Sequence, residues 1–250
     1  MDNIYIKYQK CVIEQNKLLP IQWSFKHQQD YIQILEHTTF NEGIKYLKLI
    51  TDDFSTIFNT NKQLLINLCN LNDYLGEPTK IYFEEFCTCS PSNLRYIYHS
   101  LLILNHMATL NLNTINIIEI GGGYGGLCFY IHKLSSLFNL TINSYTIFDL
   151  DDIIVLQKQY LQHFNITANT TTLDHLYNLN QDSFLISNYS FSEFSSFVQH
   201  LYQDRIIPFC NHGFLVWNGE LYVYEFTNCE FLLIENERPQ TGICNKFIYF

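Results

Sequence analysis

The chain has 250 residues, of which 47% are hydrophobic and 15% are charged, and its formal net charge is −10 at pH 7. This composition supplies enough apolar material for one large buried core and too little charge for a disordered chain. The acidic balance, with lysine and arginine nowhere clustered, argues against a protein that binds the backbone of a nucleic acid.

Residues 1 to about 110 are predicted to be mainly helical, because no glycine-rich turn and little β-branched alternation occur before the segment around Tyr82. The clearest helix begins after Ser90, a residue suited to an N-cap, with Pro91 at its first position. Its apolar face comprises Leu94, Ile97, Leu101, Leu104 and Ala108. We therefore expect this helix to pack one face on a core.

The same helix carries a second, narrow stripe made of Arg95, His99 and His106. At about 100° per residue, these three positions lie within roughly 40° of one another around the helix axis. Two interpretations remain open: the stripe faces water, or it lines a pocket against the second half of the chain.

From about residue 114 the pattern changes to strands that alternate with helices. Strands are expected at 114–120, 141–150, 165–171, 183–190 and 213–219, and helices at 125–138, 152–164 and 193–206. This alternation predicts a parallel sheet with helices on both faces. Two further strands, at 230–239 and 245–250, are joined by a short link, so they are expected to be antiparallel.

The first of these strands runs into GGGYGG at 121–126, which holds five of the ten glycines of the chain. In a doubly wound sheet, ligands bind at the carboxyl ends of the strands, and glycine lets the backbone approach them closely. The loop fits two patterns. Gly121-x-Gly123-x-x-Gly126 is a dinucleotide fingerprint, whereas Glu119-x-Gly121-x-Gly123-x-Gly125 adds an acid before the glycines.

Three observations favour the second pattern. Glu119 places a carboxylate at the loop, which repels a pyrophosphate but suits a ligand with an ammonium and a sulfonium group. The acid after the next strand, Asp149, follows Gly121 by 28 residues, beyond the roughly 20 of dinucleotide sites. The glycine strand also follows a long helical region, and the sheet ends in an antiparallel pair. These features resemble class I S-adenosylmethionine-dependent methyltransferases.

Five blocks of the sequence are similar to a narrower group, a sugar O-methyltransferase family of glycan modification. They are SPSNLRYIYH, IEIGGGYGGL, IFDLDDIIVLQKQYL, FLISNYSFSEF and ENERPQTGICNKFIYF. The resemblance spans roughly residues 76–250, and residues 1–75 carry no matching pattern. The FDL block also resembles plant small-molecule O-methyltransferases, but Asp151 stands where those enzymes have proline.

The resemblance implies an α/β fold, with the Rossmann-like sheet of class I methyltransferases, parallel except for an antiparallel C-terminal strand. Residues 1–110 would form a helical region that caps the substrate side or makes a homodimer contact. Residues 111–250 would form the domain that binds S-adenosylmethionine and releases S-adenosylhomocysteine. The substrate would be a sugar nucleotide or a glycan.

The resemblance also implies cofactor contacts. The residues concerned are Glu119, Gly121, Gly122, Gly123, Tyr124, Asp149, Leu150 and Asn188. The glycines at 121–123 would pass under the methionine part, with Glu119 near its amino group. Asp149 would accept hydrogen bonds from both ribose hydroxyls, or it could cap the helix that begins near residue 152. Leu150 would pack on adenine, and Asn188 would line the same cleft.

Methyl transfer to a hydroxyl needs in-line alignment and a general base. Glu193, which follows the fourth strand, is the first candidate for the base, and a glutamate favoured there by the helix dipole is the alternative. His99 is the second candidate, with a solvated or core histidine as the alternative. The expected sugar ligands are Arg95, Tyr124, Tyr189 and Asn218. Tyr124 could also form a wall between cofactor and acceptor.

No metal is expected in the site, because Asp151 and Asp152 are adjacent and would point about 100° apart on a helix. Eight cysteines are present, of which only Cys87 and Cys89 are close in sequence. With no second pair at zinc-site spacing, buried free thiols are expected rather than a zinc site or a disulfide framework.

A cytoplasmic protein without a membrane partner is expected, because the N-terminus lacks the apolar core of a secretion signal. No stretch approaches the roughly 18–20 apolar residues of a membrane span.

Four rival functions remain. A DNA-type amino methyltransferase would carry Asn/Asp-Pro-Pro-Tyr after the fourth strand, where this chain reads SNYSFSEF. An NAD-dependent oxidoreductase or epimerase would need a Tyr-x-x-x-Lys pair that does not follow that strand. A non-sugar O-methyltransferase and a non-catalytic domain of the same fold are the other two.

Overall fold

The computed structural model describes residues 3–175, 179–219 and 233–250. Within these residues the centre is a seven-stranded sheet in the order β5-β4-β3-β6-β7-β9-β8. Its strands are β3 (Thr114–Ile120), β4 (Thr141–Phe148), β5 (Asn169–Thr171), β6 (Ser183–Asn188), β7 (Cys210–Trp217), β8 (Leu233–Asn236) and β9 (Lys246–Tyr249).

The strands β3 to β7 run parallel, whereas β9 is antiparallel to both of its neighbours, β7 and β8. The chain winds outward from β3 to β5, then returns to the other side of β3 with β6. This arrangement is the Rossmann-like methyltransferase sheet that the sequence predicts, including the antiparallel strand at the C-terminal end. The predicted strand at 230–239 begins in residues outside the described ranges.

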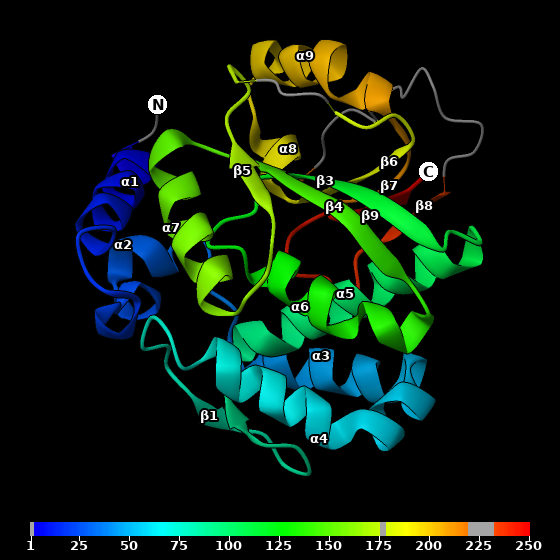
Figure 1. Ribbon diagram of the computed structural model, residues 1–250. Coiled ribbons are helices and arrows are strands. Elements are labelled where there is room, and N and C mark those ends of the chain that lie inside the picture. Colours follow the sequence, from blue (N-terminus) through cyan, green and yellow to red (C-terminus); the bar gives the residue numbers. More distant parts are fainter. Residues whose placement is uncertain (1–2, 176–178, 220–232) are drawn as a thin grey trace.

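Helices cover both faces of the sheet (Figure 1). On one side lie α5 (Pro91–Thr109), α6 (Gly126–Leu134) and α7 (Asp151–His163), and on the other lie α8 (Ser190–Glu193) and α9 (Ser196–Arg205). Alternate residues of the strands serve the two faces, as the two-residue period of a strand requires. Ile117 and Ile147 face the first group, whereas Ile118 and Ile120 face the second.

The helical N-terminal region is present as predicted. It contains α1 (Asn3–Gln15), η1 (Pro20–Gln22), η2 (Phe25–His27), α2 (Gln29–Ile32), α3 (Phe40–Asp53), α4 (Ser55–Asn72) and a hairpin of β1 (Ile81–Tyr82) with β2 (Thr88–Cys89). In Figure 1, α3 and α4 lie outside α5 and α6, while α1 and α2 lie beside α7. Buried side chains of this region and of the sheet belong to one continuous core.

Helix α5 runs through the middle of the molecule. It begins at Pro91 with Ser90 at the N-cap, as predicted, although the Ser90 hydroxyl bonds the Asp73 carboxylate instead of a helix amide. Arg95 is only 6% exposed and His99 is fully buried. The interpretation that their stripe faces water is therefore wrong.

Two predicted helices end differently from expectation. The helix predicted for 125–138 becomes α6 followed by a 3₁₀ turn, η3 (Ser135–Phe138). The one predicted for 193–206 is interrupted, because Phe194 is extended and Ser195 caps α9 by accepting a hydrogen bond from the amide of Val198. Among the described helices, none has the length and apolar character needed to cross a membrane.

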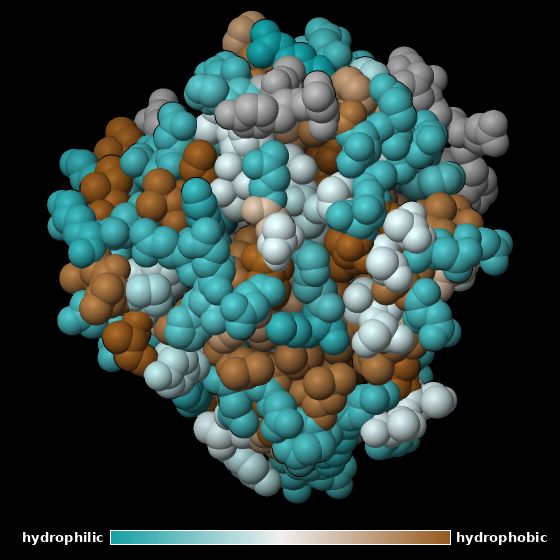
Figure 2. All heavy atoms as spheres, viewed as in Figure 1, coloured by the Kyte–Doolittle hydropathy of each residue, from teal (hydrophilic) through white to brown (hydrophobic). Residues whose placement is uncertain are grey.

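One face of the molecule is mostly hydrophilic, with apolar side chains gathered over the N-terminal helices (Figure 2). Those exposed on α1 and the segment after it are Ile6, Ile13, Leu18, Leu19 and Ile21. Each of these side chains is more than a third exposed, so this chain buries them only in part.

Candidate functional site

The glycine loop turns sharply at the carboxyl end of β3. Gly121 has φ +75°, and its amide donates a hydrogen bond of 2.8 Å to the carbonyl of Phe148 at the end of β4. A Cβ atom on Gly121 would lie 2.0 Å from the hydroxyl oxygen of Ser190, the first residue of α8. A Cβ atom on Gly123 would lie 2.7 Å from Leu35. The positive φ angles of Gly121 and Gly123, +75° and +57°, favour glycine at both positions, and the close neighbours add to that preference.

Asp149 ties this loop to the next strand. Its Oδ2 accepts hydrogen bonds from the Gly123 amide at 3.1 Å and from Gln157 Nε2 at 2.8 Å, and its Oδ1 accepts one from the Leu150 amide at 2.9 Å. Burial raises the pKa of Asp149 to about 6, and these donors act against that rise. The N-cap of α7 is Leu150, so the alternative role of Asp149 as a helix cap is wrong.

Glu119 lies directly beside the loop, on the α6 side of the sheet. Its carboxyl group is buried, accepts a hydrogen bond of 2.9 Å from the Tyr145 hydroxyl, and lies 3.3 Å from where a Cβ of Gly122 would be. Burial raises the pKa of Glu119 to about 8, with a smaller contribution from the charge of Asp149. A cation placed nearby would favour the ionised form, because opposite charges lower a carboxyl pKa.

Tyr124 does not stand on an open surface. Its ring is fully buried against Phe25 and Tyr160, its hydroxyl contacts Asn72 at 3.1 Å, and the Lys26 ammonium lies 4.3 Å from the ring centroid. The large side chain in the glycine run therefore anchors the loop to the N-terminal helices. This position does not agree with the prediction that Tyr124 forms a wall between cofactor and acceptor, or with the prediction that it contacts either ligand.

At the carboxyl end of β6, Asn188 Nδ2 lies 3.0 Å from His99 Nδ1. The His99 ring is fully buried and packs edge-on against Tyr46 and Phe247, each with ring centroids 5.7 Å away. Burial, aided by the charge of Arg95, lowers the pKa of His99 to about 3. A histidine that binds a proton so weakly does not suit the predicted role of general base, and it is a core histidine rather than a solvated one.

The same pair has unused hydrogen-bonding groups. His99 Nε2 and Asn188 Oδ1 are buried and have no hydrogen-bond partner within the described residues. Since the Asn188 amide donates to Nδ1, the ring proton is assigned to Nε2. Leaving such groups unpaired costs about 1–3 kcal/mol each, so one donor and one acceptor here suit a polar ligand.

Two predicted sugar ligands already have protein partners. Tyr189, held at φ +68°, donates a hydrogen bond of 2.5 Å from its hydroxyl to Glu237. Arg95 donates one of 2.7 Å to the carbonyl of Leu35. Arg95 thereby holds the segment whose Leu35 side chain packs on the glycine loop.

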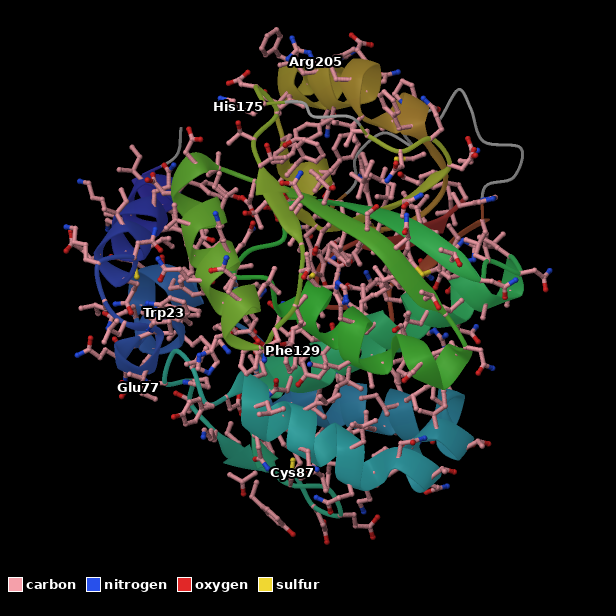
Figure 3. The ribbon with its side chains drawn as sticks, viewed as in Figure 1. Trp23, Glu77, Cys87, Phe129, His175 and Arg205 are labelled. Atoms are coloured by element: carbon pink, nitrogen blue, oxygen red, sulfur yellow. The ribbon has the colours of Figure 1, made fainter. Side chains whose placement is uncertain are left out.

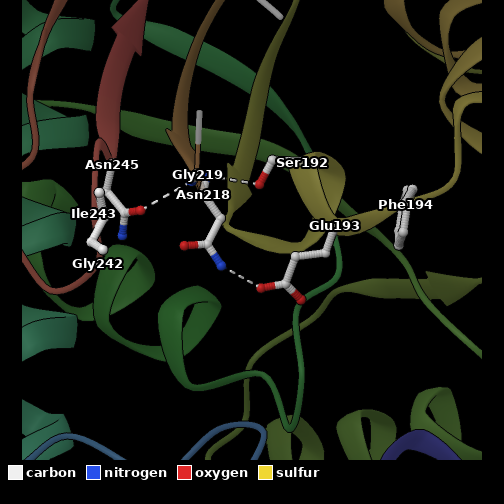
Figure 4. Close-up of a pocket in the computed structure, with 8 residues that line it drawn as sticks. All are labelled: Ser192, Glu193, Phe194, Asn218, Gly219, Gly242, Ile243 and Asn245. Carbon is white, nitrogen blue, oxygen red and sulfur yellow. Dashed lines mark hydrogen bonds between the residues drawn. The ribbon is translucent and has the colours of Figure 1, made fainter. Parts of the chain in front are cut away.

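Glu193 and Asn218 meet at an open hollow beside α8 (Figure 4). Glu193 Oε1 accepts a hydrogen bond of 2.7 Å from Asn218 Nδ2, and Oε2 accepts one of 2.8 Å from the hydroxyl of Tyr5 in α1. The hollow has a volume of about 490 Å³. Its lining residues are Ser192, Glu193, Phe194, Asn218, Gly219, Gly242, Ile243 and Asn245. A carboxylate oriented by two donors thus faces solvent.

Helix α8 links this hollow to the glycine loop. Ser190 packs against Gly121, and Glu193 reaches the hollow three residues later. Three residues of helix correspond to about 4.5 Å of axial rise. The loop and the carboxylate therefore lie at the two ends of one helical turn.

The predicted residues fall into two groups. Glu119, the glycines and Asp149 converge at the ends of β3 and β4, with Leu150 exposed beside them. Glu193 and Asn218 converge beyond β6 and β7. Sequence reasoning missed Tyr5, which bonds Glu193, and Leu35, which packs on the glycine loop. It also missed Glu237, which accepts the hydrogen bond of Tyr189 outside these two groups. Tyr5 and Leu35 lie in the part of the chain without a recognisable pattern, so no sequence signal pointed to them.

No protein-family model matches the chain, and no curated protein is significantly similar to it. Several solved structures do match. A Pyrococcus horikoshii protein described as an RNA methyltransferase matches over 76% of this chain and 96% of its own, with 13% identity and a TM-score of 0.45. The plantazolicin methyltransferase BpumL, solved with S-adenosylhomocysteine, matches over 76% of this chain and 62% of its own, with 16% identity and a TM-score of 0.37.

A Methanococcus maripaludis protein described as an S-adenosylmethionine-dependent methyltransferase matches over 48% of this chain, with 14% identity and a TM-score of 0.36. This chain spans about half of that protein, 54% of its length. At such identities and scores, these likenesses assign no activity to this chain.

Proposed function

We propose that this protein is an S-adenosylmethionine-dependent O-methyltransferase whose acceptor is a sugar hydroxyl. The observation that carries the proposal is the placement of two carboxylates, Glu119 and Asp149, beside a glycine loop at the carboxyl ends of β3 and β4. A cation and a ribose suit such a loop, because a nearby cation favours the ionised form of Glu119 and a carboxylate accepts hydrogen bonds from hydroxyls. A pyrophosphate would instead be repelled by the negative charge of Asp149. Gly121 and Gly123 take the positive φ angles, +75° and +57°, that the tight turn of this loop requires.

The residues present fit the cofactor. A carboxylate has about four acceptor sites, and Asp149 uses three of them for the amides of Gly123 and Leu150 and for Gln157. One site is left for a ribose hydroxyl, and a second hydroxyl would have to replace one of these donors. Glu119 would pair with the amino group of the methionine part, and the exposed Leu150 offers an apolar surface for adenine. When bound, S-adenosylmethionine supplies the electrophilic methyl group, and S-adenosylhomocysteine is the product.

Glu193 is the residue that we assign as general base. Its carboxylate is exposed, oriented by Asn218 and Tyr5, and only one helical turn from the glycine loop. It would take the proton of the acceptor hydroxyl as the oxygen attacks, which removes the cost of forming a free alkoxide. His99 would serve instead as a neutral hydrogen-bond donor through Nε2.

A sugar suits the hollow beside Glu193 because its lining combines two kinds of surface. Ser192, Asn218 and Asn245 supply polar groups, while Phe194 and Ile243 supply apolar ones. Sugars present hydroxyls at their edges and C–H groups on their faces, so both kinds of lining are used. A hollow that opens to solvent is compatible both with a sugar nucleotide and with the terminal sugar of a glycan.

Calorimetry tests the cofactor assignment first. Titration with S-adenosylmethionine and S-adenosylhomocysteine should give saturable binding, and titration with NAD should give none. Binding of NAD alone would overturn the proposal in favour of an oxidoreductase.

Transfer of a labelled methyl group then tests the acceptor. The panel pairs deoxy- and amino-sugar nucleotides and glycans with phenolic, non-sugar hydroxyl compounds. Label on the sugars supports the proposal, and label only on the phenols would show a non-sugar O-methyltransferase. Cofactor binding without transfer to any acceptor would favour a non-catalytic domain.

A further inference from the structure

Three cysteine thiols meet where α4 packs against the β1–β2 hairpin. The Sγ atoms of Cys69, Cys87 and Cys89 all lie within 4.8 Å of one another. Cys69 and Cys89 are fully buried, whereas Cys87 is half-buried. Cys87 is labelled in Figure 3, at the end of the molecule where the hairpin lies beside α4. This cluster is far in sequence from the glycine loop and plays no part in the proposed methyl transfer.

The hairpin explains why two of the thiols point the same way. Tyr82 pairs with Thr88 and Ile81 with Cys89, and the turn is closed by a hydrogen bond of 3.0 Å from the Phe83 amide to the Cys87 carbonyl. Side chains two positions apart on an extended segment lie on the same side. Packing against the last turn of α4 then adds the thiol of Cys69.

We propose that Cys69, Cys87 and Cys89 bind one thiophilic d¹⁰ metal ion, Zn²⁺ or Cu⁺, through three thiolates. A Zn–S bond of about 2.3 Å places two sulfur ligands of a tetrahedral ion about 3.8 Å apart. Sulfur atoms at most 4.8 Å apart reach that spacing with small side-chain movements. Soft thiolate ligands select zinc and copper(I) over magnesium or calcium.

The two ions make different demands on the site. Each cysteine must lose its thiol proton, so binding one ion releases three protons, with a net charge of −1 for Zn²⁺ and −2 for Cu⁺. Zinc prefers a fourth ligand, and a water molecule on the half-exposed side of Cys87 can supply it. Copper(I) can be bound by three sulfur ligands in a plane and needs no fourth ligand.

The position of the cluster indicates a structural role. Cys89 immediately precedes Ser90, whose amide and hydroxyl both donate hydrogen bonds of 2.7 Å to the carboxylate of Asp73 at the end of α4. An ion would therefore cross-link α4 and the hairpin at the point where α5 begins. Helix α5 carries Arg95 and His99, so the ion would fix the start of the helix that positions these two side chains.

The first test is metal-dependent protection from alkylation in the unaltered, fully reduced protein. Cys69 and Cys89 are fully buried and should resist iodoacetamide even without metal, so the half-buried Cys87 is the thiol that reports binding. With one equivalent of Zn²⁺ Cys87 should react more slowly than in the metal-free protein, while the exposed Cys244 should react at its metal-free rate. The same reaction is carried out with Cu⁺ under anaerobic conditions. The ion that protects at the lower free concentration is the one that the site prefers. Equal protection of Cys244, or no protection of Cys87 by either ion, would overturn the proposal.

Substitution then gives a matched comparison. Competition with a chromophoric chelator should show one tight Zn²⁺ or Cu⁺ per chain. Cys87→Ser should weaken that affinity by more than the roughly 10–100-fold that loss of a second-shell partner costs. Cys11→Ser, at an equally half-buried cysteine outside the cluster, should leave it unchanged.

Two outcomes would contradict the metal site. Equal affinity of the Cys87→Ser and unaltered proteins would show an adventitious ion only. The second outcome is a reduced chain that binds neither ion but forms a disulfide among the three cysteines when it is oxidised. The oxidised chain would be lighter by two hydrogens, a reductant would reverse the change, and the cluster would then be a redox pair.

Discussion

The glycine loop and the hollow beside Glu193 are built in different ways. Asp149 is held by the amides of Gly123 and Leu150 and by Gln157, all within the sheet and its following helices. Glu193 is held by Asn218 from the next strand and by Tyr5 from the N-terminal helix, 188 residues away in sequence. The carboxylate of the first site is held by residues of the sheet and of α7, although Leu35 and Phe25 also pack on its loop, whereas the carboxylate of the second is held across the whole length of the chain. A change at the loop should therefore alter cofactor affinity, and a change at the hollow should alter turnover.

The largest expected effect tests the hollow. Glu193→Gln removes the proposed base and should lower kcat by about 10²–10⁴-fold, the usual worth of general base catalysis. Affinity for S-adenosylmethionine should stay the same, because the substitution leaves the glycine loop untouched. Steady-state rates and calorimetry measure the two quantities separately. Asp204→Asn, at an exposed acid on α9, is the control. An unchanged kcat would remove Glu193 from the mechanism.

Substitution in the loop should act on folding and cofactor binding together. Gly121→Ala places a Cβ atom 2.0 Å from the Ser190 hydroxyl oxygen at φ +75°. The backbone conformation alone costs about 1–2 kcal/mol, and the contact adds to it. Urea unfolding should show this loss, and adding Ser190→Gly should recover the contact part only. Full recovery in the double variant would show that the backbone conformation costs nothing.

The substitution Asp149→Ala tests the cofactor-binding role of the glycine loop. It should weaken binding of S-adenosylmethionine by about 1–3 kcal/mol, the cost of losing a charged hydrogen-bond partner. Calorimetry measures it, with Asp151→Ala as the control because that neighbouring acid is exposed. If both variants bind with the affinity of the unaltered protein, Asp149 does not contact the ribose.

The smallest expected effect concerns pH. The pKa of Glu119 is raised to about 8 in the folded protein from an ordinary value of 4.5. Between these values the folded state keeps a proton that the unfolded state has lost, so this group's contribution to stability falls as pH rises. Glu119→Gln should flatten the loss of stability from pH 5 to 8, because the amide has no proton to lose over this range.

Thermal unfolding across this pH range measures that change. Glu84→Gln, at an exposed glutamate in the hairpin, is the control and should leave the slope alone. A steeper slope in Glu119→Gln would contradict the proposed protonation of Glu119.

The sequence by itself determined the parts whose physical signal is local. Alternating apolar residues predicted the strands, because each strand buries its own two faces. Five glycines after one of those strands predicted the loop, and an acid at the end of the next strand predicted that Asp149 would lie beside it. Parallel strands bring their carboxyl ends to one edge, so two such segments must meet whatever surrounds them.

Only the tertiary structure decided what depends on packing between distant segments. Tyr124 looked available for a ligand in sequence, but Phe25 and Tyr160 bury it in the core. His99 looked like a base, but complete burial lowers its pKa to about 3. Cys87 and Cys89 were only a pair until α4 added Cys69. The burial and the pKa of a side chain depend on all of its neighbours in space. A helical pattern in the sequence predicts which face is apolar, but it does not predict which segment will cover that face.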